Sequence, residues 1–151
     1  MKKNDFRIIS LSKFLLNEIE DISPLKMQKL LFFLRFEEIQ DKNVENSFFK
    51  EKDNFEAWIN GPVNRTSYLH FRDYFWKLDE DDLFLDLDNS IRQEISDKYS
   101  KYLEKYKDLE PEELVEKSHK NQSWKNARKG YKTNDICKVH LIEDKTFITF
   151  D

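Results

Sequence analysis

The residues that could support catalysis are few, and His119 is the most notable of them. Ser118 precedes it, and Ser123 and Trp124 follow within five positions. A histidine beside a serine can act as a general base when a carboxylate orients it, and the end of the helix predicted before His119 favours its imidazolium form. Neither serine lies in the sharp glycine-flanked turn that presents a nucleophile. A hydrolase centred on His119 is therefore kept only as an alternative.

Cofactor and metal motifs are absent from the sequence. Its two glycines, Gly61 and Gly130, lie too far apart to build a phosphate-binding loop. Cys137 is the only cysteine, which rules out an internal disulfide and any paired-cysteine metal site. The acids of 79–82 lack the spaced ligands and the central glycine of a calcium loop. We expect no cofactor, no metal and no enzymatic activity.

Charge argues mildly against general nucleic-acid binding, because the net charge is −4. One segment is an exception. Residues 117–132 contain six Lys or Arg and no acid, together with Trp124 and Tyr131. Cations beside aromatic rings can neutralise phosphates and stack on bases. Nucleic-acid binding through 117–132 is thus a second alternative. The competing interpretation is that this segment is an ordinary solvated face, or one that pairs with the acids of 79–88.

Length and hydropathy predict one domain over residues 1–151, with a core of about 6–130 and a tail of 131–151. No apolar run approaches the roughly 20 residues that cross a bilayer. The first residues carry lysines without the apolar stretch of a signal peptide. We expect a cytoplasmic protein without membrane contact. The pattern leaves self-association open.

Apolar spacing predicts about five to six helices. The second begins at Ser23-Pro24, where serine is a favoured N-cap and proline fits the first turn. Because its apolar residues surround nearly the whole circumference, we expect it to be buried and to pack on the first helix as a helical hairpin. The first helix is expected to carry Ile8 to Ile19, the second to begin at Pro24, and the third to follow Asn64 as far as Leu78. The fourth is expected to run from Ser90 to Lys107, the fifth to begin at Pro111, and the last to end at Gly130.

The β-structure is expected to be small. Residues 47–50 and 55–59 suggest a hairpin around the polar turn 51–54, with Glu56 outward and Gly61-Pro62 ending the second strand. Residues 79–88 are interpreted as an acidic loop. The tail from Val139 suggests a hairpin around 143–145, with a short terminal helix as the competing interpretation. The fold class is therefore mainly α, with a β-hairpin and a tail that could be β-rich.

Three motifs, in order, resemble the Panacea-type antitoxin domain of the SocA-like and GepA-like, phage-associated family. The first is Ile22 to Phe32, the second is Phe55 to Val63 with Tyr68 and Phe71 after it, and the third is Ser118-His119 with Trp124, Ala127 and Arg128. Together they cover roughly residues 6–130. The chain departs from the family pattern at Ser123, where a proline is usual, and at residues 33–36 and 64–67.

The resemblance implies a mainly helical, non-catalytic domain that neutralises a protein toxin by direct binding. The resemblance also suggests that the domain acts as an adaptor that delivers the toxin to a Clp-type protease. The aromatic residues of 55–76 are then either core alone or partly an interface with that partner. The residues carried over as a structural platform are Pro24, Gln28, Lys29, Glu56, Trp58, Asn60, Gly61, Pro62, Val63, Tyr68, His119, Trp124 and Arg128.

Overall fold

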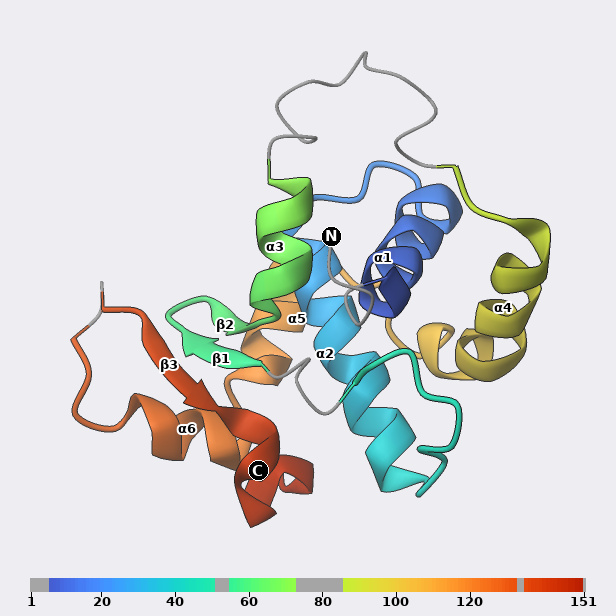
Figure 1. The fold of residues 1–151 in the computed structure, drawn as a ribbon. Helices are drawn as coiled ribbons and strands as arrows, with labels where there is room; N and C mark the ends of the chain where they lie inside the picture. Colours follow the sequence, from blue (N-terminus) through green and yellow to red (C-terminus); the bar gives the residue numbers. More distant parts are fainter. Residues whose placement is uncertain (1–5, 51–54, 73–85, 133–134, 151) are drawn as a thin grey trace.

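The helix α2 (Pro24–Gln40) runs through the middle of the molecule (Figure 1). Ser23 caps it by accepting a hydrogen bond from the backbone N–H of Lys26, and Pro24 occupies its first turn, as predicted. Ten of its residues are buried, including the polar Gln28 and Lys29. The expectation of a central, mostly buried helix is confirmed.

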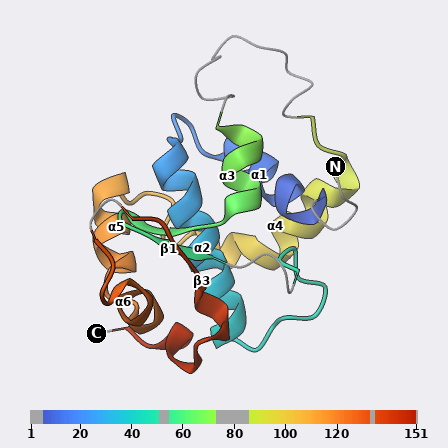
Figure 2. The same cartoon turned by 60° about the vertical axis from the view of Figure 1, so that its left-hand side comes forward.

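The computed structural model describes residues 6–50, 55–72, 86–132 and 135–150. Two views place α1 and α4 on one side of α2, and the sheet and α6 on the other (Figures 1 and 2). The mainly α fold class is confirmed. The six α-helices of the described ranges are α1 (Phe6–Glu18), α2, α3 (Arg65–Phe71), α4 (Asn89–Leu103), α5 (Pro111–Ser118) and α6 (Gln122–Arg128).

The sheet differs from the predicted hairpin. Its strands are β1 (Glu56–Trp58), β2 (Gly61–Val63) and β3 (Cys137–His140), in the antiparallel order β2-β1-β3. Gly61 does not end the β-structure; it pairs with Trp58 across the hairpin. Its φ of 104° is the positive value that the sequence suggested and that favours glycine.

The first strand predicted, 47–50, is wrong. Phe48 and Phe49 are buried in the core without joining the sheet. The N–H of Phe48 donates to the hydroxyl of Tyr99 on α4, at 2.8 Å, so its backbone is satisfied by a side chain. The predicted turn 51–54 lies outside the described residues.

The predicted boundaries of α4 differ from those observed, and the predicted end of α3 lies outside the described residues. The predicted capping box Ser90–Gln93 is wrong, because Asp88 caps α4 by accepting from the N–H of Ser90, while Gln93 donates to Asp97. α4 ends at Leu103, and turns follow it. α3 is described only as far as Phe71, so its predicted extension to Leu78 and most of the acidic loop lie outside the described residues.

The C-terminal segment forms no hairpin of its own. The competing interpretation, a short terminal helix, is confirmed in 3₁₀ form. β3 joins β1, and two short 3₁₀ helices follow, η4 (Leu141–Glu143) and η5 (Lys145–Ile148). Gly130 follows α6 with a φ of 88°, as predicted for a residue just past a helix. No helix among the described residues is long and apolar enough to cross a membrane.

Candidate functional site

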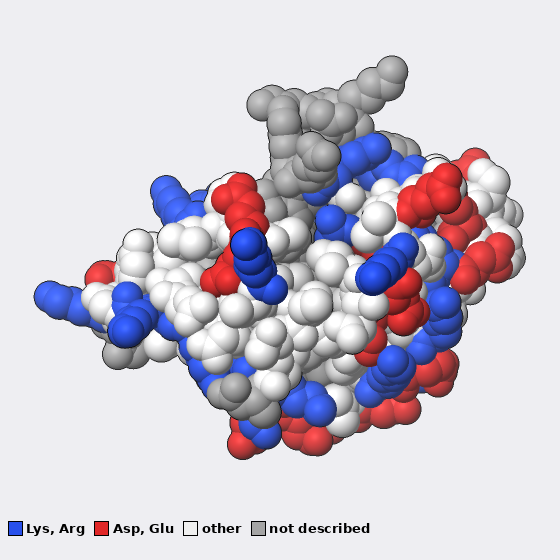
Figure 3. Space-filling model, turned by 90° about the horizontal axis from the view of Figure 1, so that it is seen from below, with Lys and Arg blue, Asp and Glu red and all other residues white. Residues whose placement is uncertain are grey.

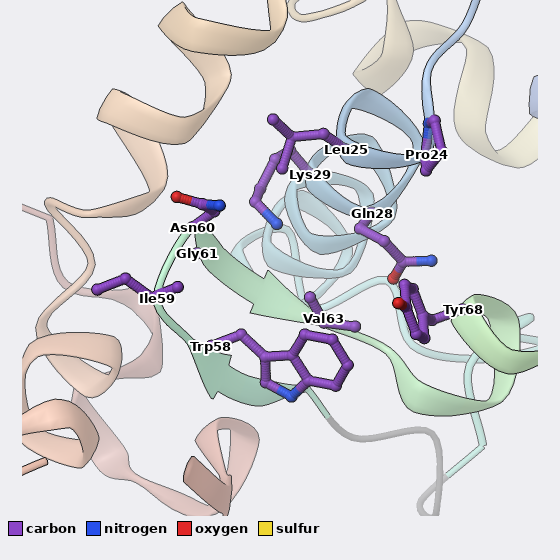
Figure 4. Close-up of a pocket in the computed structure, with 10 residues that line it drawn as sticks. All are labelled: Pro24, Leu25, Gln28, Lys29, Trp58, Ile59, Asn60, Gly61, Val63 and Tyr68. Atoms are coloured by element: carbon purple, nitrogen blue, oxygen red, sulfur yellow. The ribbon is translucent and has the colours of Figure 1, made fainter. Parts of the chain in front are cut away.

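The beginning of α2, the β1–β2 hairpin and α3 meet around a pocket of about 260 Å³ (Figure 4). Eight of the residues carried over from the resemblance line it, and Leu25 and Ile59 complete the lining. We call this set the hairpin platform: Pro24, Leu25, Gln28, Lys29, Trp58, Ile59, Asn60, Gly61, Val63 and Tyr68. The other five predicted residues, Glu56, Pro62, His119, Trp124 and Arg128, lie outside the lining, and all of them contact the hairpin or belong to it.

Lys29 is the most unusual residue of the platform. Its side chain has 0% of its surface exposed, and its Nζ donates to the carbonyl oxygen of Pro62 at 2.8 Å. Burial alone lowers the pKa of Lys29 to about 7, because a charged ammonium loses its hydration there. The contact ties the first turns of α2 to strand β2.

Gln28 connects α2 to α3. Its Oε1 accepts from the backbone N–H of Asn64 at 2.9 Å, and its Nε2 lies 3.4 Å from the hydroxyl of Ser67. Asn64 in turn caps α3 by accepting from the N–H of Ser67, as the sequence predicted. These three buried residues fix where α3 starts, and therefore where Tyr68 meets the pocket.

Glu56 was expected to point outward and is instead 7% exposed. Both of its carboxylate oxygens accept from Arg65 at 2.8 Å, and Oε1 also accepts from the indole N–H of Trp58. Burial raises the pKa of Glu56, but the hydrogen bonds from Arg65 and Trp58 outweigh it and leave the pKa below its ordinary value. This ion pair holds Trp58 edge-on to Tyr68, with ring centroids 5.0 Å apart.

The third motif clamps the hairpin turn from the other side. His119, which ends α5, has its Nε2 3.0 Å from the carbonyl oxygen of Ile59. Trp124 of α6 donates its indole N–H to the carbonyl oxygen of Trp58 at 2.9 Å. Asn121 caps α6 and so places the Trp124 ring. The resemblance grouped these residues, and the fold brings them together.

The imidazolium form expected for His119 is not favoured. Burial lowers the pKa of His119, the nearby ammonium of Lys29 lowers it further, and the Ile59 carbonyl only partly offsets them. The two serines do not reach it as nucleophiles either. Ser118 donates its hydroxyl to the carbonyl of Val115, and Ser123 donates to Asn121. The geometry gives the hydrolase alternative no support.

Arg128 is placed as a structural cation. It is 9% exposed and donates to the carbonyl oxygens of Ala57, Lys132 and Asp135. The guanidinium therefore fastens β1 to the segment after α6 and is withdrawn from solvent. This removes one of the six cations on which the nucleic-acid alternative depended.

Two more of those cations, Lys117 and Lys120, border a second pocket of about 310 Å³ lined by Phe33, Phe36, Tyr106 and Phe150. The face shown in Figure 3 carries charged residues of both signs, scattered among uncharged residues. It offers no continuous basic surface to a phosphate backbone. Among the described residues, no group of three or more His, Cys, Asp or Glu could hold a metal ion.

Sequence reasoning missed Arg65, Leu25 and Ile59. Arg65 had no signal, because its partner Glu56 becomes its neighbour only when β1 and β2 form the hairpin. Ile59 was visible in the motif, but its 40% exposure follows from its position at the tip of a turn.

A family model described as antitoxin SocA-like, Panacea domain, matches residues 27–125. No curated protein and no solved structure matches the chain. The matched residues include most of α2, the whole hairpin and the His119–Trp124 clamp, and so every platform residue except Pro24 and Leu25. The resemblance drawn from the three motifs is thereby confirmed, and the chain belongs to the family of SocA-like antitoxins with a Panacea domain.

Proposed function

We propose that the protein neutralises a cognate protein toxin by binding it directly through the hairpin platform. The observation that carries the proposal is the convergence of the three family motifs on the β1–β2 hairpin, where the first two line the pocket and the third holds the backbone of the turn. Six of the ten lining residues are apolar or aromatic side chains, which suits a protein interface.

Two exposed apolar residues lie on the elements that build the platform. Ile59, at the hairpin tip, is 40% exposed, and Leu69, next to Tyr68 on α3, is 45% exposed. The backbone beneath the tip is held by His119 and Trp124, so the surface is ordered before a partner arrives. Such preorganisation lowers the entropic cost of association.

The test is to express the product of the adjacent gene alone and together with this protein. Growth arrest by the neighbour alone, and rescue by co-expression, is the expected result. A neighbour that is harmless, or a toxic one that this protein never rescues, would refute the proposal for this chain.

Charge substitutions then locate the surface. Ile59→Asp and Leu69→Asp are expected to abolish rescue, because each places a carboxylate inside an apolar contact. Val44→Asp is the matched control, since Val44 is a 51% exposed apolar residue outside the platform. Rescue by both platform variants, or its loss only in the control, would place the interface elsewhere.

Delivery of the bound toxin to a Clp-type protease is a further proposal within this function. It predicts that co-expression shortens the half-life of the toxin and that deleting the protease abolishes rescue. A toxin that stays abundant while growth recovers would limit the function to direct neutralisation.

A further inference from the structure

Lys29 carries a titratable ammonium into the core without an acidic partner among the described residues. Burial is the only cause of its lowered pKa, and the one hydrogen bond of Nζ goes to the neutral carbonyl of Pro62. An ammonium has three N–H donors, so two have no acceptor within the ranges that the structure describes. Glu56, the buried carboxylate of the same hairpin, is taken by Arg65. Because an unpaired buried charge is costly, the arrangement indicates an acceptor that the described residues do not supply.

The pocket gives that acceptor a route. Lys29 contributes to the lining, and the surrounding walls are the side chains of Leu25, Trp58, Ile59 and Val63 (Figure 4). Lys29 has no exposed surface, so a ligand in the pocket would reach its ammonium only after a lining side chain moves. Asn60 is exposed and forms no hydrogen bond with a described residue, so it can move without losing one.

We propose that the pocket binds a carboxylate on an apolar stem, presented by the bound partner protein, and that this carboxylate pairs with Lys29. The inference rests on the proposed function, because the partner supplies the carboxylate. The apolar walls would exclude water around the pair and strengthen it. In a chain with a net charge of −4, the pocket is a local point of positive charge.

The first experiment needs no partner. The probe is 4-methylpentanoate, and the control ligand is the neutral 4-methylpentanamide, which has the same shape. Binding is followed by the backbone amide signals of Gly61 and Tyr68 in ¹⁵N-labelled protein. We expect saturable shifts with the acid. The amide should bind at least about tenfold more weakly, because it lacks one charge-assisted contact.

Lys29→Met is the matched variant, because methionine fills similar space without the charge. Lys26→Met is its control, since Lys26 lies on the same helix turn, is only half-buried, and does not line the pocket. Lys29→Met should bind acid and amide equally, and Lys26→Met should behave as the wild type. Equal binding of the two ligands by the wild type, or no binding of either, would overturn the proposal even if Lys29→Met does not fold.

The pH dependence gives an independent readout. As pH rises from 7 to 9, the wild type should bind the acid more weakly, by up to about tenfold per unit, because Lys29 loses its proton. Among the described residues, the other charged or titratable groups at the hairpin are His119 after α5, the Glu56–Arg65 pair, Arg128 of α6, and His140, which lies opposite Glu56 in the sheet. His119 is neutral in this range and the pair stays charged, since their pKa values move away from it. An affinity that does not change with pH would contradict pairing with Lys29.

The second experiment separates this inference from the proposed function. Binding of the product of the adjacent gene is measured by calorimetry for the wild type, Lys29→Met and Lys26→Met. Loss of about tenfold or more in Lys29→Met alone supports the inference. Wild-type affinity in Lys29→Met refutes it and leaves the antitoxin function standing. If the wild type does not bind this product, the function fails, and the probe titration still decides whether the pocket recognises a carboxylate.

Discussion

The imidazole of His119 lies flat against the indole of Trp124, with ring centroids 4.1 Å apart and ring planes 12° from parallel. Each ring also reaches a backbone carbonyl of the hairpin turn, at Ile59 and Trp58 respectively. The stacked pair therefore supports the hairpin platform at its tip, and the state of His119 should affect the stability of the fold.

Acid is expected to weaken the fold through His119. Its folded-state pKa is lowered below 6.5, mainly by burial and further by Lys29. The unfolded chain therefore takes up this proton at higher pH than the folded chain, and the free energy of unfolding falls as pH drops below 6.5. Urea unfolding at neutral and at mildly acidic pH should show a shallower fall for His119→Gln than for the wild type. An identical fall in both proteins would show that His119 does not titrate in this way.

Gly61 is expected to tolerate no side chain. A Cβ there would lie 2.5 Å from both Cε of Lys29 and Oγ of Ser118, in addition to the strain of a φ of 104°. Gly61→Ala should destabilise by about 3 kcal/mol, and the larger Gly61→Val by more. Gly130→Ala is the matched control, because φ is also positive there and nothing lies within 4 Å. It should cost only the backbone strain, about 1 kcal/mol. Equal losses in urea unfolding would mean that the contacts at Gly61 do not matter.

Arg128 should be required for stability. Arg128→Met leaves the carbonyls of Ala57, Lys132 and Asp135 without this donor, two of them through the segment after α6. We expect a loss of about 2–4 kcal/mol in the free energy of unfolding. Lys129→Met removes a neighbouring, exposed cation and should change stability by less than about 0.5 kcal/mol. Comparable effects of the two variants would contradict the structural role of Arg128.

Alkaline pH is expected to stabilise the free protein through Lys29. Its pKa falls from 10.5 to about 7 on folding, so between these values the unfolded chain binds the extra proton. The free energy of unfolding should rise with pH across this window, by up to about 1.4 kcal/mol per unit. Lys29→Met should flatten this rise and be more stable than the wild type at neutral pH, whereas Lys26→Met should retain it. A wild type whose stability is constant from pH 7 to 9 would exclude a buried, titrating Lys29.

Features that depend on neighbouring residues were predictable from the sequence. Ser23 and Asn64 are N-caps, Pro111 lies in a first helical turn, and Gly130 follows a helix end. Each of these preferences depends on contacts within four residues, so the local sequence is enough to predict it. The motifs also identified the stretches that form the platform. Their roles within it stay proposals.

Features that depend on distant contacts were not predictable. Phe48 has the residue type and neighbours of a strand, yet its backbone N–H donates to the hydroxyl of Tyr99, 51 positions away in the sequence. Glu56 follows an alternating pattern that places it outward, yet Arg65 neutralises it inside. The tail has strong β propensity, yet Lys145–Ile148 forms a 3₁₀ helix, and β3 joins the sheet by pairing with the distant β1. In each instance tertiary structure overrides a local preference.

The strand order β2-β1-β3 also determines when the sheet can assemble while the chain is being synthesised. β1 can pair with β2 as soon as the hairpin leaves the ribosome, but its other edge waits for Cys137, whose partner is Ala57. Contacts of such long sequence separation form late, because a large loop must close first. The clamp residue Trp124 and the cation Arg128 also emerge late. The surface beside the hairpin is therefore completed only after residues 124–140 have been synthesised, so a partner that needs this surface binds a hairpin that β3 has already joined.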